Sequence, residues 1–299
     1  MGVLEETRFI MKKYGITANK KLGQNFLISD EVVNKIVEEA QINNSDLVIE
    51  IGPGLGTLTK PLLENAGKVI CIELDTRMIK ILEDRFKLYN NFEIINNDVL
   101  KVDLKKIISE NKQGQIKNAK VVANLPYYIT TPIIMKLLEE RLDIESITVM
   151  VQKEVADRLV AKPGEANTGA ITYAINYYTK PSRIVEVDKT LFIPSPEVNS
   201  TVIKLEVLKN ASVQIENEEL MFKIIKSAFM QKRKTLLNGL ANSNLFGSKE
   251  QIEKMLNELN IDLKIRGERL TLEDYAQIAK YLEQIWQYSH FAVKYIMVY

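Results

Sequence analysis

The first half of the chain alternates short apolar runs with amphipathic helical patterns. The runs are too short for most helices and are rich in β-branched residues, which favours buried strands. Between them, apolar residues recur three or four positions apart, as on one face of a helix. Such alternation predicts a parallel sheet covered by helices on both faces. The expected strands are 47–51, 68–73, 92–96, 121–124 and 147–152, and the expected helices are 29–41, 57–64, 77–88, 103–110 and 132–141.

The pattern changes after residue 180. The apolar runs 182–187 and 200–207 are separated by a proline-containing loop rather than a helix, so we expect an antiparallel hairpin that closes the sheet. The polar stretch 209–217 lacks periodicity, and helical patterns follow at 218–241, 248–259 and 271–285. We therefore expect an α/β fold with a Rossmann-like, mostly parallel seven-stranded sheet and a second, small all-α domain. The expected divisions are 1–208 for the sheet domain, 209–284 for the helical domain and 285–299 for an unassigned apolar tail.

Composition narrows the chemistry that the chain can perform. Its 299 residues are 46% hydrophobic and 26% charged, as in ordinary globular proteins. With no secretion signal and no apolar run near the ~20 residues of a membrane span, we expect a cytoplasmic protein without a membrane partner. The single cysteine, Cys71, lies in an apolar run and is expected to be an inert core thiol, and the single histidine is His290. One Cys and one His exclude a zinc site and His-based acid–base catalysis in the body of the chain, so we expect no metal.

The run Asn124-Leu125-Pro126-Tyr127 ends the fourth expected strand. This motif can hold a planar amino group so that its nitrogen acts as a nucleophile. The Asn124 side-chain oxygen and the Leu125 carbonyl oxygen can accept the two hydrogens of that amino group. Pro126 restricts its own φ and keeps Leu125 extended, which gives that carbonyl a defined direction. Tyr127 can stack on a flat base. The alternative is a strand end followed by an ordinary proline turn.

A glycine loop follows the first expected strand, with glycines at 52, 54 and 56. Glycines let the backbone approach a ligand closely, and the helix that follows offers free N–H groups. The spacing is tighter than the G-x-G-x-x-G of dehydrogenases and is typical of methyltransferases that use S-adenosylmethionine (SAM). Glu73 and Asp98 end or follow the next two strands, where they could accept hydrogen bonds from the ribose and the adenine of this cofactor. All these groups should meet at the carboxyl edge of one sheet.

Positive charge is concentrated in two places although the net charge is only +1. Residues 221–240 contain five basic residues and no acid, and Lys232, Arg233 and Lys234 are consecutive. Residues 1–25 are also basic. Such patches can bind the phosphates of a polyanion, although either one alone could be a solvated helix face.

Taken together, these motifs resemble the ribosomal RNA adenine dimethyltransferase family, in particular the branch that acts on the small-subunit rRNA. The similarity extends from about residue 20 to residue 282. It rests on the motifs described above and on several other segments. Together these are 21–27, 50–56, 73–75, 97–98, 124–127, 152–159, 192–196, 231–236 and 266–270. The resemblance implies that Asn25 and Leu27 contact the methionine part of SAM and that Gly52 and Gly54 line its loop. It also implies that Glu73 binds the ribose, that Asp98 binds the adenine and that Asn124 lies between cofactor and target.

The resemblance further implies the reaction and the partner. Methyl groups would pass from SAM to N6 of two adjacent adenosines near the 3′ end of small-subunit (16S) rRNA, within an assembling 30S subunit, and we expect the enzyme to be a monomer. The target base would be flipped out and stacked on Tyr127 and Phe192, with Phe192 as a core aromatic being the alternative. Lys232, Arg233 and Lys234 would contact RNA. Two departures stand out: Thr168 replaces an aromatic residue of the family, and the tail 285–299 has no counterpart.

Three other functions compete with this interpretation. A large-subunit rRNA adenine dimethyltransferase of the macrolide-resistance type shares most of the motifs, but segments 152–159 and 266–270 favour the small-subunit branch. A non-catalytic rRNA-binding assembly factor could retain the fold, but the intact Glu73, Asp98 and Asn124 argue against lost activity. The glycine spacing argues against a nicotinamide dehydrogenase.

Overall fold

The computed structural model describes residues 1–19, 22–165, 167–231 and 233–296, with residues 287–296 described by their backbone alone. The chain forms two compact units: Met1–Val160 with Lys180–Leu208, and Ala161–Thr179 with Lys209–Tyr299. One boundary between the two units falls after Leu208. The segment 161–179, which we expected in the first domain, instead groups with the helices of the second unit.

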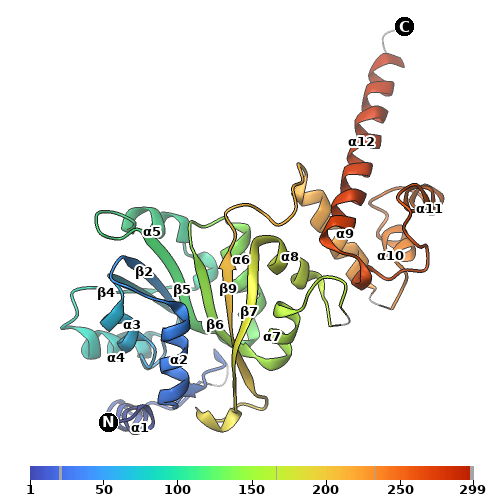
Figure 1. Cartoon of the computed structure of the whole chain (residues 1–299). Helices are drawn as coiled ribbons and strands as arrows, with labels where there is room; N and C mark the ends of the chain where they lie inside the picture. The colour runs from blue at the N-terminus through green and yellow to red at the C-terminus, as the bar shows by residue number, and fades with distance from the viewer. Residues whose placement is uncertain (20–21, 166, 232, 297–299) are drawn as a thin grey trace. The chain divides into compact units, whose positions relative to one another are not determined.

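The first unit is built on a seven-stranded sheet with the order β4-β3-β2-β5-β6-β9-β7 (Figure 1). The pairs β2–β3, β3–β4, β2–β5 and β5–β6 are parallel, and β9 pairs antiparallel with β6. This is the predicted architecture of a mostly parallel sheet closed by an antiparallel element. The strands are β2 (Asp46–Ile51), β3 (Lys68–Glu73), β4 (Phe92–Asn96), β5 (Asn118–Asn124), β6 (Ser146–Gln152), β7 (Thr179–Val187) and β9 (Ser200–Val207).

Helices cover both faces of this sheet, with α2 on the near face and α6 on the far face in Figure 1. Strand β2 is buried at every position, which explains why its sequence is mostly apolar on both faces rather than alternating, with Asp46 and Glu50 as its two polar residues. On one face, Val48 of β2 and Val122 of β5 share a core cluster with Val33 and Ile36 of α2. The helices of this unit are α1 (Val3–Tyr14), α2 (Asp30–Ala40), α3 (Thr59–Asn65), α4 (Thr76–Phe86), α5 (Leu104–Asn111), α6 (Thr130–Glu139) and α7 (Lys153–Val160).

The sequence pattern did not predict three features of the first unit: helix α1, helix α7 and a short two-stranded ribbon. The N-terminal helix α1 buries Ile10 in the core cluster, and the Asp30 carboxylate accepts from the Val3 N–H at 3.1 Å. A short antiparallel ribbon pairs β1 (Phe26–Leu27) with β8 (Phe192–Ile193) and places Leu27 opposite Phe192. The ribbon therefore joins the segment before α2 to the loop between β7 and β9.

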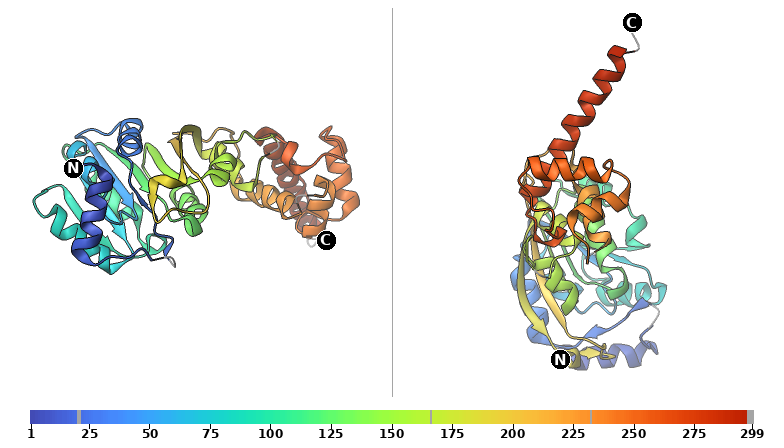
Figure 2. Two further views of the ribbon diagram at one scale, coloured as in Figure 1. Left: turned by 90° about the horizontal axis from the view of Figure 1, so that it is seen from below. Right: turned by 90° about the vertical axis from the view of Figure 1, so that its right-hand side faces the viewer.

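The second unit is helical. The pattern at 218–241 forms two helices rather than one, because Thr235 caps a new helix by accepting from the Asn238 N–H. Helix α12 continues through residues 285–296 of the tail, as Figure 2 shows, and Ile285 and Trp286 are exposed. The helices are α8 (Ala170–Tyr178), α9 (Glu218–Met230), α10 (Leu236–Ser243), α11 (Lys249–Glu258) and α12 (Leu272–Ile296).

Candidate active site

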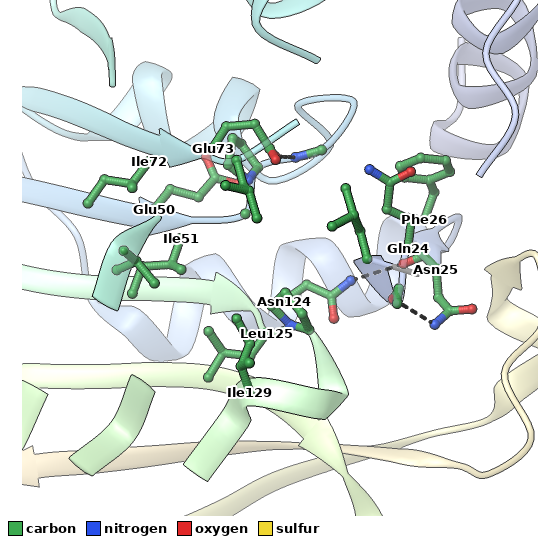
Figure 3. Close-up of a pocket in the computed structure, with 18 of the residues that line it drawn as sticks. Gln24, Asn25, Phe26, Glu50, Ile51, Ile72, Glu73, Asn124, Leu125 and Ile129 are labelled. Carbon is green, nitrogen blue, oxygen red and sulfur yellow. Dashed lines mark hydrogen bonds between the residues drawn. The ribbon is translucent and has the colours of Figure 1, made fainter. Parts of the chain in front are cut away.

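One pocket collects the predicted site residues of the first unit except Phe192 (Figure 3). It lies where the sheet order reverses between β2 and β5, the position at which open α/β sheets bind ligands. Its walls come from segments that are far apart in the sequence, and most of them follow the carboxyl ends of parallel strands. The lining segments are 22–27, 50–55, 57–58, 72–74, 97–99 and 124–129. Asn25, Leu27, Gly52, Gly54, Glu73, Asp98, Asn124, Leu125 and Tyr127 are therefore brought together.

The glycine loop after β2 has a backbone that favours glycine, and part of it is closely packed. Gly54 has a φ of +57°, and a Cβ there would lie 3.3 Å from the Phe26 ring. Gly56 has a φ of +84°, and a Cβ there would lie 2.6 Å from the Phe86 ring of α4. The positive φ favours glycine at both positions, and at Gly56 space also excludes a side chain, so the loop backbone is left to form the wall of the pocket.

Glu73 joins this loop to the end of β3. One carboxylate oxygen accepts from the Gly54 N–H at 3.2 Å, and the other accepts from the Asp75 N–H at 2.8 Å. The residue is only 7% exposed, and burial raises the pKa of its carboxyl group against the effect of these two donors. Each oxygen retains a lone pair that can accept from a ligand hydroxyl.

The neighbouring acids hold the pocket walls in place. Asp75 caps α4 and accepts from Gln24 Nε2 at 2.9 Å, which ties the N-terminal segment to the end of β3. An ion pair with Arg77, with 2.6 Å between Nη2 and Oδ2, lowers the pKa of Asp75. Asp98 caps a short 3-10 turn by accepting from the Leu100 N–H at 3.0 Å, and it is half-buried at the pocket.

Asn124 has a fixed orientation at the end of β5. Its Nδ2 donates to the Asn25 carbonyl at 3.2 Å, and Asn25 Nδ2 in turn donates to the Gly23 carbonyl at 3.1 Å (Figure 3). The Leu125 N–H donates to the Met150 carbonyl at 3.1 Å, which anchors the next peptide to β6. Among the described residues, no donor is hydrogen-bonded to Asn124 Oδ1 or to the Leu125 carbonyl oxygen. These two acceptors at the pocket are therefore available to a ligand.

The two predicted stacking residues occupy different environments. Tyr127 is half-buried in the pocket wall, its hydroxyl lies 2.5 Å from Ser200 Oγ, and burial raises its pKa. Phe192 is 3% exposed, belongs to the hydrophobic core and does not line the pocket. The structure thus brings Tyr127 to the site but places Phe192 in the core, the alternative that the sequence left open.

Arg85 of α4 is a contact of the glycine loop that the sequence did not reveal. Its guanidinium donates to the Leu55 carbonyl and pairs with Glu6 of α1, with 2.6 Å between Nη2 and Oε1. Because Leu55 lies in the pocket wall, the N-terminal helix is connected to that wall through one side chain.

The predicted RNA-contacting residues lie in the second unit. Arg233 and Lys234 are exposed after α9, and Lys232 lies outside the described residues. Thr168 is buried, and its hydroxyl donates to the Glu165 carbonyl at 3.0 Å, so this side chain faces the interior of its unit.

Neither a membrane span nor a metal centre is found in the described part of the chain. None of its helices is both long and apolar enough to cross a bilayer. Within the same residues, no three or more His, Cys, Asp or Glu side chains are grouped so that they could hold a metal ion.

Comparison with known proteins identifies relatives along nearly the whole chain. Residues 15–284 match the family model described as ribosomal RNA adenine dimethylase. The ribosomal RNA small subunit methyltransferase A of Geobacillus sp. (strain WCH70) is 48% identical over 281 residues, which covers 93% of this chain and 96% of the relative. The protein of the same name from Alkaliphilus oremlandii is 46% identical, with the same coverage of both chains.

Solved structures show the same fold. A dimethyladenosine transferase from Plasmodium falciparum superimposes with a TM-score of 0.69 at 29% identity, covering 85% of this chain and 95% of that chain. The 23S rRNA methyltransferase ErmE superimposes with a TM-score of 0.65 at 22% identity, covering 87% of this chain and all of that chain. Because the identity with ErmE is only 22%, this similarity supports a shared fold and nothing further.

Proposed function

Because this chain belongs to the ribosomal RNA adenine dimethylase family, and is thus a SAM-dependent rRNA adenine dimethyltransferase, we propose that it acts on the small-subunit rRNA. Its targets are N6 of two adjacent adenosines near the 3′ end, in an assembling 30S subunit in the cytoplasm, and the enzyme is a monomer. The relatives that are 46–48% identical carry the small-subunit name, which supports this branch over the large-subunit alternative.

The pocket fits SAM by the chemistry of its walls. The glycine loop leaves room for a ligand against the backbone, and the buried Glu73 carboxylate can accept from ribose hydroxyls. Asp98, Asn25 and Leu27 line the same pocket, and in this proposal Asp98 accepts from the adenine amine while Asn25 and Leu27 contact the methionine part. When bound, SAM supplies a methyl group on a positively charged sulfur, which makes that carbon electrophilic.

Asn124 and Leu125 hold the nucleophile. The adenine amine is a weak nucleophile because its lone pair is delocalised into the ring, and two hydrogen-bond acceptors return electron density to nitrogen. Asn124 Oδ1 and the Leu125 carbonyl oxygen accept the two N6 hydrogens and aim N6 at the methyl carbon. Methylation would make N6 acidic, and Asn124 Oδ1, the Leu125 carbonyl oxygen or water would take up the proton that it releases. Holding the two reactants in line can supply roughly 7–11 kcal/mol of the rate acceleration.

One observation supports this role in holding N6. Among the described residues, Asn124 Oδ1 and the Leu125 carbonyl oxygen accept no hydrogen bond, while Asn124 Nδ2 already donates to the Asn25 carbonyl. Tyr127 stacks on the flipped base, and the exposed Arg233 and Lys234, together with Lys232, contact RNA phosphates. A stacking role for Phe192 stays a prediction, and its side chain would have to leave the core to perform it. An assembly factor without activity would have no need for such an oriented amide.

The test is methyl transfer from tritiated SAM to small ribosomal subunits that lack the modification. We expect Asn124→Ala to lower kcat by roughly 10²–10³, by analogy with the loss of a preorganised polar group in other enzymes. Asn65→Ala, the same change at an exposed position on α3, is the matched control and should retain wild-type activity. Near wild-type turnover by a folded Asn124→Ala variant would refute the acceptor role, and transfer to large subunits alone would favour the alternative substrate.

A further inference from the structure

Tyr128 is an aromatic residue of the pocket that has no role in the scheme above. It follows Tyr127 on the 3-10 turn Tyr127–Ile129, where successive side chains point about 120° apart. Tyr127 is directed toward Ser200 at the start of β9, to which its hydroxyl is hydrogen-bonded. Tyr128 lies instead beside Gly23, on the side of the N-terminal segment. The two rings thus occupy different walls of the pocket.

Tyr128 is more exposed than the neighbouring residues of its segment in the pocket wall. Its exposed fraction is 55%, whereas Tyr127 is half-buried and Leu125 is buried. Tyr128 belongs to the lining segment 124–129, so its ring is at once part of the wall and open to solvent. An aromatic face in this position offers a flat apolar surface at the edge of the site.

The loop that supports the Tyr128 ring also orients the N6 acceptor. A Cβ on Gly23 would lie 3.4 Å from Tyr128 Cδ1, so the ring rests against the Gly23 backbone. The Gly23 carbonyl accepts from Asn25 Nδ2, and the Asn25 carbonyl accepts from Asn124 Nδ2. The ring and the Asn124 amide are therefore positioned by the same few residues.

We propose that Tyr128 forms a second base-stacking subsite, which holds the nucleotide next to the flipped adenosine. This inference rests on the proposed function, since it requires an RNA strand at the pocket. The two acceptors can hold only one amine, so the neighbouring base must lie outside them, and the exposed ring at the edge is placed to receive it. Every base has a π face, so this subsite accepts a purine or a pyrimidine and contributes to binding rather than to sequence selection.

Kinetics on unmethylated small subunits test this subsite with two variants of the full chain. Tyr128→Leu keeps an apolar side chain but removes the aromatic face, and Tyr128→Phe keeps the face and removes the hydroxyl. Loss of one base–aromatic stack typically weakens binding about 5- to 150-fold. We expect Tyr128→Leu to raise KM for subunits within that range, with kcat within about threefold of wild type. Tyr128→Phe should restore wild-type KM.

Phe9→Leu is the matched control, because Phe9 is 57% exposed on α1 and does not line the pocket. Calorimetry with SAM gives a second readout, and the SAM Kd of Tyr128→Leu should equal that of the wild type. A parallel loss of SAM affinity would instead assign Tyr128 to the cofactor wall. An equal loss in both Tyr128 variants would point to its hydroxyl, and an unchanged KM in Tyr128→Leu would remove the subsite. If the wild-type enzyme itself fails to methylate small subunits, the proposed function fails, and this is seen before any variant is compared.

Discussion

Replacing Glu73 by Gln should weaken SAM binding because the amide cannot reproduce what the carboxylate does. In the structure, one oxygen accepts from Gly54 N at 3.2 Å and the other from Asp75 N at 2.8 Å, and the side chain is nearly buried. A glutamine offers one oxygen and one NH₂ group, so one of the two backbone N–H groups would face another donor. The charge that accepts from the ribose would also be lost.

The magnitude follows from these lost interactions. Hydrogen bonds to a charged group contribute about 1.5–3 kcal/mol, which corresponds to a rise of roughly 10- to 150-fold in the Kd for SAM. One unsatisfied buried N–H should also lower the free energy of unfolding by about 1–3 kcal/mol. The effect on binding should exceed any effect of Glu73→Gln on kcat at saturating SAM, because Glu73 is not one of the groups that hold the nucleophile.

Isothermal titration calorimetry measures the SAM Kd, and urea unfolding measures the stability of the same preparations. Glu93→Gln is the control, since Glu93 lies on the adjacent strand β4, is exposed and pairs with Lys68 on β3 outside the pocket. It should leave the SAM Kd unchanged. If Glu73→Gln is folded and binds SAM as tightly as the wild type, Glu73 is not the ribose ligand and the orientation of the cofactor in the pocket must be reconsidered.

Three further predictions concern pH, RNA and the tail. Burial raises the pKa of Glu50 to about 7, so the folded state holds a proton that the unfolded state releases above its ordinary pKa near 4.5. The free energy of unfolding of the wild type, relative to that of Glu50→Gln, should therefore fall by about 3 kcal/mol as the pH rises from 4.5 to 8. Urea unfolding at these two pH values measures the difference, and a difference that stays constant would contradict the raised pKa. Neutralising Lys232, Arg233 and Lys234 should flatten the log–log salt dependence of RNA binding by up to roughly 0.7–0.9 per lost phosphate contact, and an unchanged slope would leave them a solvated surface. Deleting 285–299 should preserve methylation but alter self-association in analytical ultracentrifugation, and loss of activity in a folded truncation would assign the tail to the enzyme's function.

The sheet and its pocket could be predicted because local patterns and a general rule of topology agree. Continuous apolar runs identify β2 and β3, and their carboxyl ends must meet at one edge of a parallel sheet. Glu73 and Asn124 therefore had to lie close together, although they are about fifty residues apart in the sequence. Glycine spacing then indicated the type of ligand. Each of these inferences depends on a short segment and on connections that right-handed βα units make predictable.

Contacts between distant segments could not be predicted in the same way. Helix α8 groups with the helical unit because the buried Tyr173 donates to the Leu270 carbonyl at 2.7 Å, and nothing near Tyr173 in the sequence reveals that partner. Arg85 is one of many basic residues on helices, and only the structure shows it bonded to Leu55. Phe192 illustrates a different limit, because an aromatic residue at the start of a strand fits a core and a stacking site equally well.

A nucleobase amine that has gained one methyl group has a single hydrogen left, so the two acceptors at the end of β5 cannot both be used in the second transfer. The bond from Asn124 Nδ2 to the Asn25 carbonyl keeps the amide from turning, and the φ of −59° at Pro126 belongs to a ring that cannot rotate. With a rigid pair of acceptors, the monomethylated base must itself rotate about its C6–N6 bond, which has partial double-bond character. The competition between that rotation and departure of the RNA then decides processivity: whether one encounter yields the dimethylated base or releases a half-finished one.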